Sequence, residues 1–100
     1  MTIEMLKIGS VLDSRPAGRE AFLALRPTLG NNADSPMNKE HLTLDFHGVT
    51  LLTPSFADEF ITPLTQLYPG RISFANTENI TVQKTLAFLS KDWPEGTYAH

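Results

Sequence analysis

The sequence predicts an α/β domain with a mostly parallel or mixed sheet of four to five strands, packed against about three helices. Residues 41–46 alternate between polar and apolar side chains, as a half-buried strand does. Helical spacing follows in the apolar residues Phe56, Phe60, Leu64 and Leu67. The predicted order of strand, helix, strand, helix, strand and helix favours parallel strands joined by crossovers, whereas a ferredoxin-like arrangement would need more antiparallel pairing.

Composition indicates one domain and argues against several classes of function. One hundred residues, 41% of them hydrophobic, are enough for a single core over residues 1–100 and too few for two. The formal charge of −3 and the pI near 5.5 give no attraction toward phosphate backbones or anionic lipid, so we expect neither a nucleic-acid nor a membrane partner. The absence of cysteine excludes disulfides, thiolate metal sites and cysteine nucleophiles.

No targeting segment or membrane span is visible in the sequence. The first ten residues, MTIEMLKIGS, lack the basic segment and apolar run of a secretory signal. No apolar stretch approaches the roughly 20 residues of a membrane-spanning helix. A cytoplasmic location is therefore expected.

Short strands are predicted near the N-terminus. Apolar residues between Ile3 and Leu12 indicate one or two strands at a sheet edge, and Gly9 and Ser10 break the run.

The first helix is predicted to begin at Ser14, which is suited to the N-cap and is followed by Pro16 in the first turn. Pro27 should end or distort this helix, because the residue before a proline is pushed out of the helical region. The expected core face consists of Phe22, Leu25 and Leu29.

Two segments are expected to lie outside regular structure. Residues 28–40 are rich in Gly, Asn, Asp, Ser and Pro, which indicates a mobile loop. Residues 92–100 form a polar tail. We expect Trp93 to fold back and bury its indole, although an aromatic contact of Trp93 or Tyr98 at an oligomer interface remains open.

The centre of the chain leads from a strand into a capped helix. Either Thr53 or Ser55 can cap this helix: Thr53 puts Pro54 at the favoured first position, and Ser55 has Asp58 at capping-box spacing. Pro63 removes one backbone donor and predicts a kink or an early end nearby. The buried side of the strand should consist of Leu42, Leu44 and Phe46.

A short strand and a last helix complete the predicted order. Ile72 and Phe74 indicate a short buried strand, and Asn79 then caps the helix. The core face of this helix should consist of Val82, Leu86 and Leu89.

Polar residues gather where the central strand gives way to the helix, over residues 47–60. Ligands and partners of open α/β sheets usually meet the carboxyl ends of the strands. The same residues also have a structural explanation, because a capping hydroxyl and acids near a helix N-terminus together stabilise the helix by about 1 kcal/mol or more. The candidate partner-binding or switch surface consists of Asp45, Thr53, Ser55, Asp58 and Glu59.

No pattern in the sequence supports catalysis, a metal or a cofactor. Asp58 and Glu59 are adjacent and point about 100° apart on a helix, so they do not converge on one substrate atom. With Asp45 they suggest a Mg²⁺ site, but no phosphate-cradling glycine loop or basic clamp accompanies them. Metal-ligand spacing is also absent from the histidines, His41, His47 and His100. We therefore expect a protein that is not an enzyme.

Charge is unevenly distributed along the chain. Residues 31–60 contain five acidic residues and one lysine, a local charge of −4. A partner docking there should present Lys or Arg, and salt should slow the association. On the first helix, snorkelling around an apolar face explains a basic stripe better than a nucleic-acid or partner contact does; the stripe consists of Arg15, Arg19 and Arg26.

Four segments resemble the STAS-like family, which is related to sulphate-transporter and anti-sigma-factor-antagonist domains. SRPAGRE resembles the opening of the family's first helix, and LDFHGV resembles its strand and turn. SFADEF is the most specific segment, and ISFAN resembles the following strand. Residues 28–40 and the tail after Lys91 lie outside the resemblance.

The resemblance implies a four- or five-stranded sheet backed by helices in a bacterial regulatory protein without chemistry of its own. It also implies a regulatory partner protein, such as a histidine-kinase-like ATPase or an anti-sigma factor. In anti-sigma-factor antagonists, a serine at the start of the helix is phosphorylated by the partner kinase. That position falls on Pro54 here, and Ser55 follows one place later.

Three functions are therefore compared. The preferred one is a protein-interaction module in bacterial signalling or transcriptional regulation, which docks through residues 47–60. An alternative is a small-molecule or nucleotide-binding domain that uses the carboxyl ends of the strands. An enzyme built on Asp45, Asp58 and Glu59 would need a metal and ranks last. Homo-oligomerisation is compatible with each of them.

Overall fold

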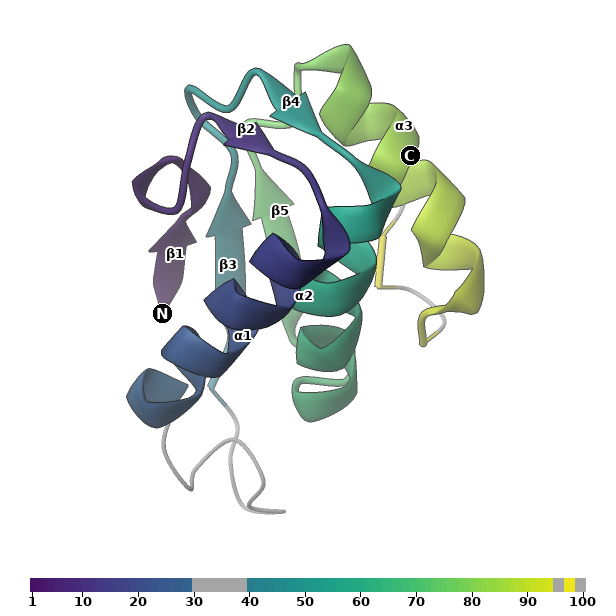
Figure 1. The fold of residues 1–100 in the computed structure, drawn as a ribbon. Helices are drawn as coiled ribbons and strands as arrows, with labels where there is room; N and C mark the ends of the chain where they lie inside the picture. The colour runs from purple at the N-terminus through teal and green to yellow at the C-terminus, as the bar shows by residue number, and fades with distance from the viewer. Residues whose placement is uncertain (30–39, 95–96, 99–100) are drawn as a thin grey trace.

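A parallel three-stranded sheet forms one layer of the fold, as Figure 1 shows. This computed structural model describes residues 1–29, 40–94 and 97–98. The sheet has the order β1-β3-β5 and consists of β1 (Thr2–Glu4), β3 (Leu42–Asp45) and β5 (Ile72–Ala75). A separate parallel pair is formed by β2 (Val11–Leu12) and β4 (Leu51–Leu52).

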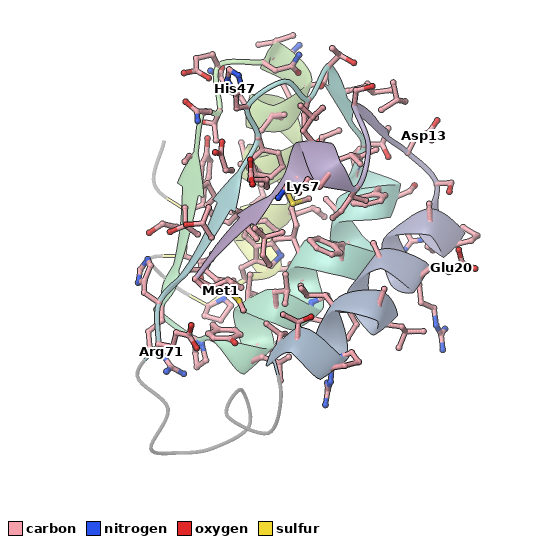
Figure 2. All side chains as sticks on the ribbon, turned by 90° about the vertical axis from the view of Figure 1, so that its left-hand side faces the viewer. Met1, Lys7, Asp13, Glu20, His47 and Arg71 are labelled. Carbon is pink, nitrogen blue, oxygen red and sulfur yellow. The ribbon has the colours of Figure 1, made fainter. Side chains whose placement is uncertain are left out.

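Three helices accompany these strands. They are α1 (Arg15–Leu29), α2 (Pro54–Leu67) and α3 (Ile80–Leu89), together with the short 3₁₀ turns η1 (Met5–Lys7) and η3 (Ser90–Asp92). Figure 2 shows the strands of the main sheet on one side and α1 and α2 on the other. The predicted α/β class, the parallel strands and the three helices are confirmed.

The prediction of a single sheet of four to five strands was wrong, because the strands form one sheet of three strands and one of two. The chain turns sharply after β3: the Val49 N–H donates to the Phe46 carbonyl at 3.0 Å, and Gly48 has φ of 82°. A β-carbon on Gly48 would lie 2.7 Å from Leu6 Cδ2, so only glycine fits both the space and the dihedral. This turn directs β4 to β2 and away from β3. The expected direct passage from strand to helix was therefore wrong as well.

The N-terminal strand prediction was only partly right. β1 lies at the edge of the sheet as predicted, but Met5–Lys7 form a 3₁₀ turn. Met5 is fully buried, whereas Leu6 and Ile8 are exposed. The apolar run therefore anchors a turn through one side chain and does not extend a strand.

The predicted buried face of β3 is confirmed. Leu42, Leu44 and Phe46 are buried, while Thr43 and Asp45 between them are half-buried. Because all three buried side chains lie on the helix side of the strand, the core is formed between the sheet and the helices.

Helix α1 begins at the predicted cap but continues past the predicted end. The Ser14 hydroxyl oxygen accepts from the Ala17 N–H at 3.3 Å. Pro27 lies inside α1, which ends at Leu29, so the expected end at Pro27 was wrong. In the last turn the missing N–H leaves only the Leu23 carbonyl without its helical partner, and Leu23 is exposed to water. The expected core face is confirmed by buried Leu29 and partly buried Phe22 and Leu25.

Pro63 also fails to end its helix. Helix α2 continues to Leu67, and the Tyr68 N–H still donates to the Leu64 carbonyl at 2.9 Å. Leu64 is fully buried on the face of α2 that packs into the core. Packing on both sides of Pro63 therefore holds the helix together, and the predicted early end was wrong.

The C-terminal elements match their predictions. The Asn79 side chain accepts from the N–H groups of Thr81 and Val82 and so caps α3. The predicted fold-back of Trp93 is confirmed, because its indole is buried. The predicted loop falls mostly on residues 30–39, which lie outside the described residues, while Thr28 and Leu29 belong to α1. None of the helices in the described part of the chain combines the length and the apolar content needed to cross a bilayer.

Candidate functional site

The N-terminus of α2 carries four of the five predicted site residues. Thr53 is the N-cap: its side-chain oxygen accepts from the Phe56 N–H at 3.4 Å, and Pro54 occupies the first helical position. The alternative prediction, in which Ser55 caps the helix and forms a capping box with Asp58, was therefore wrong. Ser55 is half-buried, and its hydroxyl makes no hydrogen bond with any residue that the structure describes.

Replacing Thr53 should therefore weaken the fold more than replacing Ser55. We expect Thr53→Ala to lower the free energy of unfolding by about 1 kcal/mol, the usual contribution of a capping side chain. Ser55→Ala should change it by less than about 0.5 kcal/mol, as substitutions away from such features usually do. Urea unfolding monitored by circular dichroism measures both. Equal losses in the two variants would restore Ser55 as the cap.

Asp58 and Glu59 face an arginine from the first helix. Arg15 Nη1 lies 2.9 Å from Asp58 Oδ2 and 3.6 Å from Glu59 Oε2. The hydrogen bond to Asp58 raises the pKa of Arg15 above its ordinary value. The side chains of Asp58 and Glu59 are 40% and 30% exposed, so the surface stays open to solvent. Arg15 partly neutralises the acidic surface that the sequence predicts.

Asp58 also begins a chain of hydrogen bonds through the protein. The Thr62 hydroxyl donates to Asp58 Oδ1 at 3.2 Å, and the Trp93 indole N–H donates to the same Thr62 oxygen at 2.8 Å. With the Arg15 contact, this chain connects α1, α2 and the C-terminal segment. Asp58 is therefore held by several elements, unlike a freely solvated acid.

Asp45 occupies a different place. Its Oδ1 accepts from the Asn76 side-chain amide at 2.7 Å and from the His47 backbone N–H at 3.0 Å. These bonds join the carboxyl ends of β3 and β5, where Asn76 adopts a left-handed φ of 56°. Among the described residues, Asp45 has no hydrogen bond or ion pair with the other four predicted site residues. It is part of a connection between strands.

The Asp45 contacts predict a pH dependence of stability. The Asn76 hydrogen bond, and after it the His47 N–H, lowers the pKa of Asp45 below its ordinary value of 3.8. A carboxyl group with a lowered folded-state pKa stabilises the fold fully above its unfolded-state pKa, and this contribution disappears as the pH falls through the folded-state value. The urea midpoint of the wild type should therefore exceed that of Asp45→Asn at pH 7.

The same comparison at pH 3 supplies the check. The difference between the two midpoints should shrink there, because protonation removes the charge that the mutation removes. A difference of equal size at both pH values would contradict the role of the Asp45 charge.

Sequence reasoning missed three residues of these clusters. Arg15 was assigned to a snorkelling stripe, and Thr62 and Asn76 were not considered as partners of the acids. Arg15 and Asp58 are separated by 43 positions, so no local pattern reports their contact. Asn76 had one usable signal: an asparagine directly after a strand is suited to a left-handed turn.

The two grooves of the described structure lie away from this surface. A groove of about 740 Å³ runs between β5 and α3, and another of about 510 Å³ runs between β1 and α1. Neither groove is lined by a predicted site residue. Within the described ranges, no group of three or more His, Cys, Asp or Glu side chains is arranged to hold a metal ion.

Comparison with known families identifies the chain's relatives. Residues 30–81, just over half of the chain, match the family described as STAS-like domain of unknown function (DUF4325). The chain belongs to this STAS-like family. No curated protein and no solved structure gives a match.

The match differs in extent from the resemblance drawn from the sequence. It includes LDFHGV, SFADEF and ISFAN, so the STAS-like assignment is confirmed where those motifs lie. SRPAGRE in α1 lies outside the match, whereas residues 30–40, which had been left out of the resemblance, lie inside it. The family segment thus contains β3, β4, α2 and β5, and it includes the whole candidate surface.

Proposed function

We propose that this STAS-like domain is a non-enzymatic protein-interaction module of bacterial signalling or transcriptional regulation. It docks a regulatory partner, such as a histidine-kinase-like ATPase or an anti-sigma factor, through the N-terminal half of α2. The observation that supports this most directly is the charge cluster of Arg15, Asp58 and Glu59, which lies at a partly exposed helix start beside the half-buried, unbonded hydroxyl of Ser55.

Helical geometry places Ser55 beside this charge cluster. Asp58 and Glu59 follow Ser55 by three and four positions, so the three side chains are neighbours on one face of α2. Arg15 contacts both acids and therefore lies over the same face. A partner that reads this surface meets both signs of charge within a small area, which favours a specific docking orientation.

Phosphorylation of Ser55 would change this cluster. A phosphate at the second helical position is stabilised by the helix N-terminus and attracts Arg15, while Asp58 and Glu59 repel it. Arg15 then divides its contacts between the phosphate and Asp58. We propose that this exchange changes the docking surface and thereby the affinity for the partner.

Affinity capture tests the docking surface. Immobilised wild type should retain a regulatory partner from a lysate of the source organism, and Asp58→Lys/Glu59→Lys should retain at least several-fold less. Glu4→Lys/Glu20→Lys makes the same change in net charge on β1 and α1, and it should bind like the wild type. Thermal melts of both double variants show whether each is folded. Equal retention by the two folded variants would place docking elsewhere.

The Ser55 step needs its own measurement. The captured partner is purified, and its Kd for the wild type is compared with its Kd for the protein phosphorylated at Ser55 and for the Ser55→Asp variant. Each of these two forms should differ from the wild type in Kd by at least several-fold. Ser55→Ala should bind like the wild type, because the unmodified hydroxyl has no bond to lose. An unchanged Kd for the phosphorylated chain would remove the switch and leave the docking surface.

A further inference from the structure

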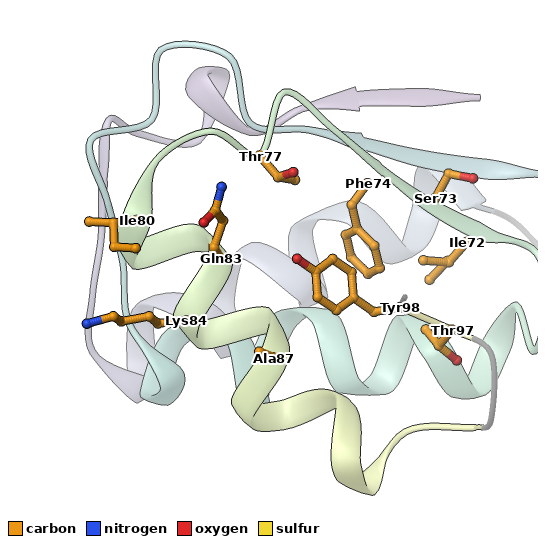
Figure 3. A pocket seen from close by; sticks show the side chains of 10 residues that line it. All are labelled: Ile72, Ser73, Phe74, Thr77, Ile80, Gln83, Lys84, Ala87, Thr97 and Tyr98. Atoms are coloured by element: carbon orange, nitrogen blue, oxygen red, sulfur yellow. The ribbon is translucent and has the colours of Figure 1, made fainter. Parts of the chain in front are cut away.

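The groove between β5 and α3 has the form of a binding site for an extended chain. Its volume is about 740 Å³, and β5 forms one wall. Figure 3 shows the rings of Phe74 and Tyr98 beside one another, with the side chains of Thr77 and Gln83 in the neighbouring part of the groove. Helix α3 packs mainly on α2 and β4, while the C-terminal segment reaches β5 through Tyr98, whose ring centroid lies 5.6 Å from that of Phe74.

Backbone groups of β5 point into this groove. The carbonyls of Arg71 and Ala75 accept from Leu42 and Phe46 on the β3 side, at 2.8 and 2.9 Å. Successive residues of a strand direct their N–H and C=O groups to opposite sides. The backbone groups of Ile72 and Phe74 therefore point away from β3, and no strand in the described part of the chain pairs with them.

This edge lacks the devices that usually protect a sheet edge. β5 has the sequence ISFA, without charge or proline, and it pairs with β3 residue by residue without a bulge. The opposite edge strand, β1, is shorter, contains Glu4 and runs directly into the 3₁₀ turn η1. The edge strand β1 is therefore protected against pairing with a further strand, whereas the edge strand β5 is not.

Charge complementarity indicates what would occupy the groove. Lys84 is the charged residue among the side chains that line it, and Lys91 follows in η3, outside the lining. Residues 79–91 contain no acid, although the whole chain has a net charge of −3. Neither lysine forms an ion pair with a described residue. A partly apolar groove whose lining carries one positive charge and no negative charge fits an acidic chain.

The geometry points to a second interaction surface: the β5–α3 groove binds an extended acidic segment of a partner protein, which adds to the sheet as a fourth strand beside β5. The edge backbone groups supply the hydrogen bonds, and alternate side chains of the added strand enter the groove. Lys84 selects for acidic residues. This surface is separate from the N-terminus of α2 and does not depend on the docking proposed there.

Synthetic peptides test the added strand. The probes are an octapeptide of alternating valine and aspartate and its valine–lysine counterpart, titrated into the ¹⁵N-labelled full chain. The aspartate peptide should shift the amide resonances of Ile72 and Phe74, slow their hydrogen exchange and bind at least tenfold more tightly than the lysine peptide. Absence of shifts at these two amides with either peptide at millimolar concentration would overturn the proposal.

N-methylation distinguishes strand addition from loose charge attraction. Only every second N–H of an added strand faces β5, so methylating one alternate set of residues should abolish binding while methylating the other set spares it. Equal effects of the two patterns would overturn strand addition. Sedimentation of the protein without peptide checks whether a second copy occupies the groove instead. A dimer in which the amides of Ile72 and Phe74 are already protected from hydrogen exchange would also overturn the proposal.

Matched charge variants locate the acidic selectivity. Lys84→Glu should weaken binding of the aspartate peptide at least fivefold. Lys91→Glu lies outside the groove lining and should change the Kd of the peptide less than twofold. Equal weakening in both would contradict a role for the groove. Asp58→Lys/Glu59→Lys should bind the peptide like the wild type, which separates failure of this surface from failure of the α2 surface.

Discussion

Replacing Gly18 with alanine is expected to lower the free energy of unfolding by about 2–3 kcal/mol, because α1 crosses α2 at this residue. A β-carbon on Gly18 would lie 2.4 Å from the Phe56 carbonyl oxygen and 3.1 Å from the Phe56 Cα. These are backbone atoms of a buried helix, which cannot move aside as a flexible side chain can. The better helix propensity of alanine, worth about 1 kcal/mol, offsets only part of the clash.

Urea unfolding monitored by circular dichroism measures this loss, with Gly9→Ala as the matched control. A β-carbon on Gly9 would meet its nearest atoms at 3.5 and 3.6 Å, which is ordinary contact, so its change should stay within about 0.5 kcal/mol. Similar values for the two variants would show that α1 shifts on α2 without loss. If Gly18→Ala also weakens partner capture in its folded form, the helix crossing positions Arg15 over the docking surface.

Replacing Trp93 with alanine is expected to have the larger effect, about 3–5 kcal/mol. The indole is 6% exposed, lies stacked against Phe74 with ring centroids 5.8 Å apart, and donates its N–H to Thr62 Oγ1. Trp93→Ala leaves a cavity and removes one of the ring contacts of Phe74, whose contacts with Phe46 and Tyr98 remain. Trp93→Phe keeps an aromatic ring and loses the hydrogen bond, so it should lose about 1–2 kcal/mol.

The control for Trp93 is another aromatic residue of the same part of the chain. Phe88 is 59% exposed, so Phe88→Ala should change the free energy of unfolding by less than about 0.5 kcal/mol. All four proteins can be compared by far-UV circular dichroism, which does not depend on the tryptophan itself. A Trp93→Ala variant within 1 kcal/mol of the wild type would mean that the C-terminal segment is not part of the core.

Sequence patterns correctly predicted the elements that depend on residues close together in the sequence. The alternation around Leu44 placed β3, and the Asn79 cap placed the start of α3, because both signals lie within a few residues of the structure that they specify. Thr53 and Ser55 were equally good caps by spacing. Only the observed N–H contact of Phe56 decides between them.

The predictions that failed concern contacts between distant segments or very short elements. A second short strand after Gly9 and Ser10 was one of the two readings of the N-terminal run, and β2 is that strand. Its pairing with β4 was not foreseeable, because β4 has two residues, too few to show any period. Pro27 was expected to end or distort its helix, and Pro63 to kink its helix or end it early. Both helices continue past the proline, because tertiary packing and an exposed last turn accommodate the missing N–H groups. The pairing of Arg15 with Asp58 depends on how α1 crosses α2. Gly18 permits this close crossing, and no periodic pattern in the sequence indicates it.

The α1–α2 contact has a practical meaning for anyone who trims this protein. The segment that matches the STAS-like family, residues 30–81, leaves out α1 and Trp93. Expressed alone, it would present the Phe56 side of α2 and the ring of Phe74 to water, and aggregation would follow. We therefore expect the smallest unit that folds stably to be larger than the segment that matches the family.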